Sequence, residues 1–402
     1  MLFRLTLSLS LMFAIFTAGG PAYADGGAQI SGCIAALPQT GGVCDFRNQG
    51  TVSADSTVVI DKPVTLLLDG TQLTLEGTPG MLIAADGVRI EGTTGQTKLI
   101  QGGTTGNVIY GNSLSDLKIE GVTFVGVPGS IPRDNMSGIR LQNTEPGNIH
   151  RVRIVGNVFT GFCQHGVMIQ NATDVIVEDN VIEGVADGIR FSGVVGGKIL
   201  GNTIRDTELP NNGAFAVAIG LDTTAPQDDG VSYPISRNIE IAHNTVSTYV
   251  NGEAVMIHSG MSLLIADNLF DNVLVGIGID PFNSTDLLCH VTVTGNTYMG
   301  TMTEGALSTT GNYGIYVGGG AGTVTPSYVV VTHNIIGQAN QIVRSPGQAG
   351  IGIGYADHVL VEENIVHDSV SNGIKVRDSN GRVVVRNNYV TNIVSPGRGS
   401  YN

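Results

Sequence analysis

The sequence predicts an all-β fold in which three short strands per coil stack into a single-stranded parallel β-helix. The first observation is a pattern of alternating apolar residues that ends in asparagine, as in residues 152–159 around Asn157. Its variants place the motif asparagine at Asn157, Asn180, Asn202, Asn244, Asn268, Asn296, Asn334, Asn364 and Asn388. The successive intervals are 23, 22, 42, 24, 28, 38, 30 and 24 residues. A motif that returns about every two dozen residues is typical of a stacked-repeat protein.

The second observation is a further short strand that recurs between the asparagines. Each copy begins with Gly or Ala followed by a β-branched residue, as in residues 188–191 (GIRF) and 276–279 (GIGI). With one strand before each asparagine and a short one after it, every coil has three strands. Strands of this length that alternate between inward and outward residues are expected to stack in parallel.

The first 24 residues have the features of a secretory signal peptide. Arg4 precedes an apolar run over residues 5–16, and residues 22–24 (AYA) give an Ala-x-Ala cleavage site. No later stretch approaches 18 consecutive apolar residues. The sequence therefore predicts a secreted or periplasmic protein that is not inserted in a membrane.

Residues 25–55 interrupt the pattern and are expected to form an N-terminal cap, with a short helix at residues 34–37 that Pro38 ends. A cap is needed because the end of a solenoid exposes apolar interior and unpaired strand edges. The parallel β-helix is then expected over residues 56–402.

The four cysteines differ in what they can form. Cys33 and Cys44 are close in sequence, and a disulfide between them is expected in an oxidising compartment. Cys163 and Cys289 lie about five coils apart, and parallel strands about 4.8 Å apart would separate them by roughly 24 Å. That distance is too long for a disulfide.

The chain is acidic, with 34 Asp and Glu against 20 Lys and Arg, a formal net charge of −14 at pH 7. Loss of Arg4 with the signal peptide would make the balance about −15. This charge argues against nucleic acid and anionic membranes as partners. A polyanionic substrate would need a bridging cation or a local basic patch that overrides the mean field.

The repeat resembles right-handed parallel β-helix proteins of the pectin-lyase-like superfamily, from about residue 56 to the C-terminus. The resemblance implies right-handed coils and an internal asparagine ladder along one bend, in which each side chain hydrogen-bonds the coils above and below. Such folds serve lyases, hydrolases, epimerases, tail spikes and non-catalytic adhesins, so the resemblance does not by itself select an activity.

Insertions into the repeat are concentrated beside the sheet formed by the third strands. The interval from the third strand to the next motif asparagine is 13 residues in regular coils, but 27 residues from Val217 to Asn244 and 19 in two later coils. The interval from a motif asparagine to the following third strand also lengthens in three coils. Loops on both sides of a flat sheet, the largest at residues 221–236, would form the walls of a groove.

Charged residues gather on the third-strand sheet beside these loops. Ile189 and Phe191 are expected to point inward, so Arg190 should point outward. The expected groove residues are the catalytic candidates Arg190, Asp222, Glu253, His258 and Asp280 and the substrate-binding candidates Arg140, His165, Asp187 and Tyr316.

Elimination or epimerisation of a uronate is one chemistry that suits this set. It needs a cation to neutralise the carboxylate, for which Arg140 or Arg190 is a candidate, and a base for the sugar C5 proton, for which His258 or His165 is a candidate. Residues 278–282 (GIDPF) are similar to the Asp-Pro-His element of mannuronan C5-epimerases. By that similarity Asp280 matches the aspartate, whereas Phe282 occupies the histidine position.

Hydrolysis is another chemistry, and it needs paired carboxylates, for which Asp222, Glu253 and Asp280 are candidates. The same acids would suit a divalent ion such as Ca²⁺, which binds oxygen ligands. No residue is assigned as a metal ligand, and the need for a cofactor is left open.

The sequence thus predicts a secreted carbohydrate-active enzyme that cleaves or epimerises a polysaccharide, expected to contain uronic acid, in a groove on one parallel sheet. The alternative is a non-catalytic glycan-binding or cell-surface structural solenoid. The lack of Trp and the 5% aromatic content favour this alternative, because sugar clefts usually stack rings on aromatic side chains.

Overall fold

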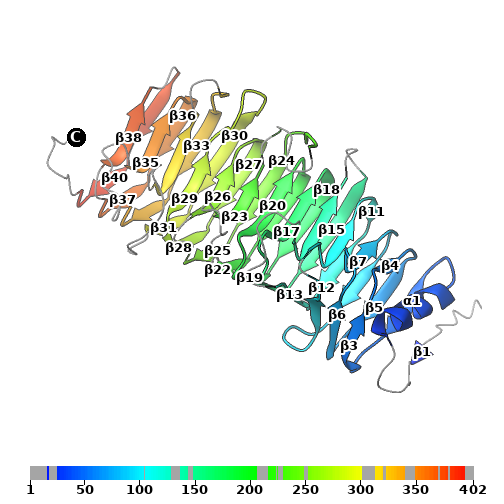
Figure 1. Ribbon diagram of the computed structural model, residues 1–402. Helices are drawn as coiled ribbons and strands as arrows, with labels where there is room; N and C mark the ends of the chain where they lie inside the picture. The colour runs from blue at the N-terminus through cyan, green and yellow to red at the C-terminus, as the bar shows by residue number, and fades with distance from the viewer. Residues whose placement is uncertain are drawn as a thin grey trace, which may run out of the picture.

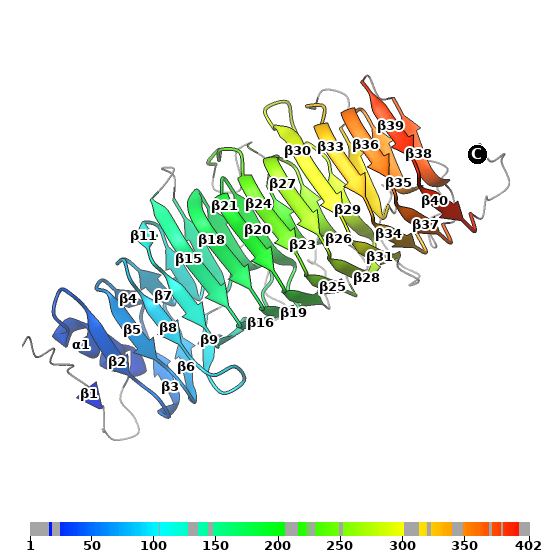
Figure 2. The same cartoon turned by 180° about the vertical axis from the view of Figure 1, so that it is seen from behind.

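The computed structural model describes residues 16–17, 25–103, 105–127, 136–143, 148–205, 216–222, 224, 230–248, 252–300, 313–319, 323–339, 349–369, 372–378 and 381–393. Within these residues the predicted parallel β-helix is confirmed. Three parallel sheets run side by side along one elongated solenoid, with helix α1 (Gly26–Ala36) at the N-terminal end (Figure 1). The same stack of coils is seen from behind in Figure 2.

Each sheet collects one strand from nearly every coil. Sheet A contains the strands that precede the motif asparagines: β1 (Phe16–Thr17), β2 (Gly42–Asp45), β5 (Val64–Leu67), β8 (Arg89–Glu91), β11 (Leu114–Ser115), β12 (Lys118–Glu120), β15 (Ile149–Val155), β18 (Ala172–Glu178), β21 (Val195–Leu200), β24 (Arg237–Ala242), β27 (Gly260–Ala266), β30 (Leu288–Thr294), β33 (Ser327–Thr332), β36 (Asp357–Glu362) and β39 (Val383–Arg386). Sheet B contains the strands that follow them: β3 (Gly50–Ala54), β6 (Thr71–Leu75), β9 (Lys98–Gln101), β13 (Thr123–Val125), β16 (Val158–Thr160), β19 (Val181–Glu183), β22 (Thr203–Arg205), β25 (Thr245–Ser247), β28 (Leu269–Val273), β31 (Thr297–Gly300), β34 (Ile335–Gly337), β37 (Ile365–His367) and β40 (Tyr389–Thr391). Sheet C contains the third strands: β4 (Val58–Ile60), β7 (Met81–Ile83), β10 (Ile109–Gly111), β14 (Ile139–Gln142), β17 (His165–Gln170), β20 (Asp187–Ser192), β23 (Ala216–Leu221), β26 (Gly252–Ile257), β29 (Val275–Ile279), β32 (Ile315–Gly318), β35 (Ala349–Gly354) and β38 (Asn372–Arg377).

The N-terminal end of the solenoid is covered by helix α1, which is longer than the helix expected at residues 34–37. The Asp25 side chain caps this helix by accepting a hydrogen bond from the backbone N–H of Gly27 at 2.9 Å. Ile30 and Ile34 are buried and face the first coil, where α1 packs against β2, β3 and β4. Strands β2 and β3 already belong to sheets A and B, so the first coil lies within the range 25–55 that was expected to be the cap.

The expected disulfide between Cys33 and Cys44 is confirmed, with a Cα–Cα distance of 6.0 Å. It ties α1 to β2 and so fixes the cap on the first coil. Cys163 and Cys289 form no disulfide, as their separation predicted. Apart from Phe16–Thr17, the expected signal peptide lies outside the described residues. No helix in the described part of the chain is long and apolar enough to cross a membrane.

The expected asparagine ladder is confirmed along the bend between sheets A and B. From Asn157 to Asn388, the backbone N–H and the Nδ2 group of each motif asparagine donate to Oδ1 of the next at 2.8–3.1 Å. The residue before each asparagine has a positive φ, including His243 at 58° and Glu363 at 56°, which turns the chain sharply between the two sheets. The ladder satisfies buried polar groups and sets the register of every coil.

Inward-facing aliphatic side chains form one continuous core along the solenoid axis. In sheet C, for example, Val167, Ile189, Ile219, Val255 and Ile277 stack on successive strands and are fully buried. Because neighbouring coils repeat the same inward column, the outward columns are aligned as well. Residues that are far apart in sequence therefore become neighbours on the outer face of sheet C.

Candidate functional site

The outer face of sheet C presents three aligned columns of side chains. The first runs through His165, Asp187, Val217, Glu253 and Val275, as the strand register requires. The second runs through Arg140, Met168, Arg190, Gly220, Met256, Gly278 and Tyr316. The third contains Ser192, Asp222, His258 and Asp280, which the backbone hydrogen bonds of the strand ends place on successive coils. The predicted site residues thus share one face.

Arg190 is held by carboxylates on both sides. Its guanidinium forms ion pairs with Asp187 at 3.3 Å and with Asp222, whose other carboxylate oxygen accepts a hydrogen bond from the Ser192 hydroxyl at 3.0 Å. The side chain lies across the next coil because that coil carries Gly220. A Cβ at Gly220 would lie 2.7 Å from Cδ of Arg190. Arg190 is therefore a fixed positive charge at one side of the site.

His165 is mostly buried beside this cluster. Its Nε2 lies 3.5 Å from Asp187, and its Nδ1 lies 3.4 Å from the Ser137 hydroxyl. Burial, followed by the nearby charges of Arg190 and Arg140, holds the pKa of His165 well below its usual value. A neutral imidazole between Ser137 and Asp187 supports the carboxylate that orients Arg190. Arg140 itself donates from Nε to Gln142 at 2.9 Å and lies two coils from Arg190.

Glu253 and Asp280 form the acidic centre of the site. The Glu253 carboxylate lies over Gly278, where an added Cβ would be 2.9 Å from its Oε2 atom. Asp280 follows the end of β29 and lies two residues after Gly278, so the Cα atoms of Gly278 and Asp280 are roughly 7 Å apart at the usual rise per residue. Burial raises the pKa of Asp280 to about 6. Burial and then the charge of Asp280 raise the pKa of Glu253 to about 7, against an opposing effect of Arg190.

The raised pKa values of Asp280 and Glu253 indicate which of the two carboxyl groups loses its proton first. Asp280 loses its proton first, while Glu253 is still neutral, and the resulting negative charge then holds the proton on Glu253. Between about pH 6 and 7 the pair therefore favours the state with one protonated and one ionised carboxyl group. This is the pairing of proton donor and anion that acid–base catalysis uses.

His258 lies between Asp222 and Asp280 in the third column. Its Nδ1 is 2.7 Å from the backbone carbonyl of Asp280, and a carbonyl only accepts, so Nδ1 carries the proton. Burial is the main cause that lowers the pKa of His258. The neutral imidazole thus keeps Nε2 as a hydrogen-bond acceptor. The ring of Phe282 lies 5.4 Å from the imidazole, centroid to centroid.

Tyr316 extends the site by one coil. Its hydroxyl lies over Gly318, which follows Asp280 in the third column, and burial raises the pKa of Tyr316 to about 12, with a smaller contribution from the charge of Asp280. Tyr313 lies beside it, with ring centroids 5.0 Å apart. The sequence therefore supplies an aromatic surface next to the acidic pair despite its low aromatic content.

The sequence did not point to several residues of this face. Ser137 and Ser192 hold predicted residues in place, and Gly220 and Gly278 make room for Arg190 and Glu253. The alternating glycines of residues 276–278 were the available signal, because a strand interior rarely uses glycine unless something approaches it closely. The loops expected to wall the groove fall largely at residues 206–215, 225–229, 301–312 and 340–348, outside the described residues.

Gly278 gives a direct test of the packing in this site. We expect Gly278→Ala to displace the Glu253 carboxylate, because the new methyl group would occupy its position. Any turnover that depends on Glu253 should fall at least tenfold, since a displaced carboxylate would lose its alignment with a substrate. Thermal unfolding should change by only a few degrees, because the clash involves the end of a flexible side chain. Gly354→Ala is the control, since its nearest neighbour lies at an ordinary 3.5 Å.

No group of three or more His, Cys, Asp and Glu side chains in the described part of the chain has the arrangement of a metal site. Asp222 is tied to Arg190 and Ser192, while the Glu253 carboxylate lies over Gly278, two residues before Asp280.

Comparisons with known proteins place the fold in a broad structural group. The surface adhesin PfbA of Streptococcus pneumoniae aligns with a TM-score of 0.58 and 13% identity, over 92% of this chain and 87% of the adhesin. An exopolygalacturonase from Thermotoga maritima aligns with a TM-score of 0.56 and 12% identity, over 92% of this chain and 89% of the exopolygalacturonase. The A-module of an Azotobacter vinelandii mannuronan C-5 epimerase aligns with a TM-score of 0.51 and 16% identity, over 96% of this chain and 95% of the A-module. At these identities the likeness concerns the fold alone.

Sequence comparison gives the same answer for the family. No curated protein matches the chain. The family model of the right-handed beta helix region matches residues 69–218 and 137–336, which together span more than half of the 402 residues. The chain therefore belongs to the right-handed parallel β-helix family.

Proposed function

We propose that the protein is a carbohydrate-active enzyme that hydrolyses glycosidic bonds over sheet C, with Glu253 as the proton donor. The observation that carries this proposal is the pair of Glu253 and Asp280, whose raised pKa values leave one group protonated and the other ionised near neutral pH. Glycosidases use such a pair to protonate the leaving oxygen and to stabilise or attack the sugar cation.

The remaining residues have supporting roles in this proposal. Asp280 acts as the anion that receives or stabilises the positive charge developing on the sugar. Tyr316 and Tyr313 supply an aromatic surface for a sugar ring one coil away. Arg190, fixed by Asp187 and Asp222, limits how far the pKa of Glu253 rises. Export of the protein by its N-terminal segment belongs to the same proposal, because polymeric glycans are found outside the cytoplasm.

A second candidate is proton abstraction from a uronate, leading to elimination or epimerisation. It is favoured by His258, whose Nδ1 donates to the Asp280 carbonyl so that Nε2 is left as the basic nitrogen. The pairing of Arg190 with Asp187 and Asp222 counts against this candidate, because it leaves the guanidinium less available to a substrate carboxylate. We therefore rank hydrolysis first.

Products from a panel of neutral and acidic polysaccharides test the two candidates together. Hydrolysis releases new reducing ends without an unsaturated uronate, whereas elimination gives both. Epimerisation changes the sugar configuration, seen by proton NMR, without new ends. If the mature protein alters none of these glycans but binds some of them, the non-catalytic glycan-binding alternative replaces the proposal.

The pH profile of turnover follows from the two raised pKa values. Hydrolysis needs Asp280 ionised and Glu253 protonated, so kcat/KM should rise with pH through about 6 and fall through about 7. The plot of kcat/KM against pH should therefore be a narrow bell, and both of its sides report the titration of the coupled pair Glu253 and Asp280. Initial rates between pH 4.5 and 9 measure it. A rate that increases steadily up to pH 9 would exclude Glu253 as the proton donor.

A further inference from the structure

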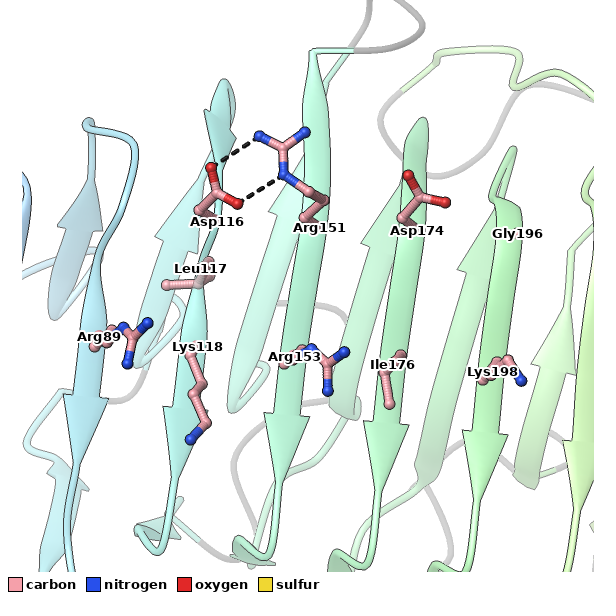
Figure 3. A pocket seen from close by; sticks show the side chains of 10 residues that line it. All are labelled: Arg89, Asp116, Leu117, Lys118, Arg151, Arg153, Asp174, Ile176, Gly196 and Lys198. Atoms are coloured by element: carbon pink, nitrogen blue, oxygen red, sulfur yellow. Dashed lines mark hydrogen bonds and ion pairs between the residues drawn. The ribbon is translucent and has the colours of Figure 1, made fainter.

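A row of basic side chains crosses the outer face of sheet A in the N-terminal half of the solenoid. The strand register pairs Arg89 with Lys118, Lys118 with Arg153, Arg153 with Ile176 and Ile176 with Lys198. Figure 3 shows these side chains projecting from neighbouring strands. They line a depression with a volume of ≈ 400 Å³. We call Arg89, Lys118 and Arg153 the cationic row.

The members of the cationic row differ in their partners. Lys118 pairs with Glu120 at 2.6 Å, and two coils beyond the row Lys198 pairs with Glu240 at 2.9 Å. Arg89 and Arg153 are exposed, and no described residue forms a hydrogen bond or an ion pair with either guanidinium. The two arginines lie on either side of Lys118, roughly 10 Å apart at the usual spacing of parallel strands.

This arrangement is unusual for a protein with a net charge of −14. Three like charges on adjacent coils repel one another, and acidic side chains are abundant in the chain as partners. A guanidinium in water offers donors that match a carboxylate or sulfate bidentately. A local basic patch of this kind attracts an anion even when the protein as a whole is acidic.

From this geometry we propose that the cationic row binds an anionic polysaccharide that carries carboxylate or sulfate groups. In an extended polyuronate, the charges recur once per sugar, close to the coil spacing of about 4.8 Å along the solenoid axis. Successive anionic groups can therefore meet Arg89, Lys118 and Arg153 in turn. Ile176, the next position in the row, offers an apolar surface to the following sugar ring.

An anionic polysaccharide differs from other polyanions in its charge density. Duplex DNA carries one negative charge per about 1.7 Å of its axis and would bring many phosphates against the surrounding acidic surface. An anionic membrane would likewise face the whole protein rather than one row. A glycan chain is narrower and more sparsely charged, so it can contact the row while meeting few acidic residues, chiefly Asp116, which Arg151 already pairs, and Asp174 at the edge of the depression. The row belongs to sheet A, so this proposal does not depend on the chemistry of sheet C.

The double variant Arg89→Gln/Arg153→Gln tests the proposal, with binding of a polyuronate and of a sulfated glycan measured by calorimetry at low salt. We expect wild-type protein to bind at least one of them, with affinity that falls as salt rises. The double variant should lose about tenfold or more in affinity, equivalent to about 1.4 kcal/mol. The control is Arg205→Gln/Arg386→Gln, which changes the charge equally at exposed arginines paired with Glu183 and Glu362 and should bind within twofold of wild type.

Three results would overturn the proposal. One is that wild-type protein binds neither glycan at low salt. Another is that both double variants lose affinity equally, which would show a general charge effect. The third is that duplex DNA or vesicles with anionic lipids bind more tightly than either glycan and lose that binding in Arg89→Gln/Arg153→Gln. Circular dichroism of each variant confirms that a loss of affinity is not a loss of fold.

Discussion

Glu253→Gln is expected to lower glycan cleavage by about 10³-fold or more while leaving the fold intact. Glutamine keeps the size and the hydrogen-bonding capacity of the side chain but cannot donate a proton to the leaving oxygen. General acid catalysis commonly contributes 10²–10⁴-fold, and glycosidic cleavage depends strongly on it. The rate of reducing-end release at pH 6.5, near the centre of the predicted pH bell, measures the effect.

The stability of Glu253→Gln provides its control. The pKa of Glu253 is raised in the folded protein, so its deprotonation between the unfolded value near 4.5 and the folded value of about 7 destabilises the fold as pH rises. Removing the ionisable group should therefore increase the free energy of unfolding at pH 8 by about 3 kcal/mol, and change it little at pH 4. Retained activity in a stable Glu253→Gln protein would exclude the proposed proton donor.

The largest effect on stability is expected from the asparagine ladder, for example from Asn244→Ala. Asn244 Nδ2 donates to the carbonyls of Ile199 and Ala242 and to Oδ1 of Asn268, and its Oδ1 accepts from the backbone N–H and Nδ2 of Asn202. Alanine leaves these buried groups unpaired, and each costs about 1–3 kcal/mol. We expect a loss of about 3–6 kcal/mol in chemical denaturation.

Asn388→Ala is the matched control in the last described coil. Its Nδ2 donates to the carbonyls of Val361 and Arg386, and its Oδ1 accepts from Asn364, but it is only half-buried. Water can replace most of these bonds, so the loss should be about 1–2 kcal/mol. If Asn244→Ala and Asn388→Ala destabilise equally, burial of the ladder is not the source of its contribution.

The repeat made the fold predictable from sequence. A motif asparagine such as Asn244 occurs in every coil from Asn157 to Asn388, so its position defines the coil and the facing of its strands without any knowledge of long-range contacts. The disulfide between Cys33 and Cys44 was predictable for a similar reason, since both cysteines belong to one short segment. The exact start of the first coil was less visible, because β2 and β3 lack the asparagine motif.

The site was predictable in part. The outward alternation on sheet C correctly grouped Arg190, Glu253 and Asp280 on one face. The direction of each side chain along the solenoid axis was not predictable, and it decides which charges pair. Arg190 extends over Gly220 to reach Asp222 on the next coil, so one of the two cations expected to neutralise a substrate carboxylate is bound within the protein.

The cationic row on sheet A could not be predicted from the sequence, for a different reason. Arg89, Lys118 and Arg153 are 29 and 35 residues apart, in coils that precede the first motif asparagine or contain it. The mean charge of the chain is strongly negative, so composition gave no hint of a basic surface. Only the strand register of irregular coils brings these three side chains together.

A titration of the Glu253 carboxyl group tests the central claim most directly, because it requires no knowledge of the substrate. Carbon-13 NMR of protein labelled at the glutamate carboxyl carbons would follow the resonance that is missing in Glu253→Gln. We expect an apparent pKa of about 7 in wild-type protein and a lower value in Asp280→Asn, since the charge that retains the proton is removed. A wild-type pKa near 4.5 that Asp280→Asn leaves unchanged would contradict the account.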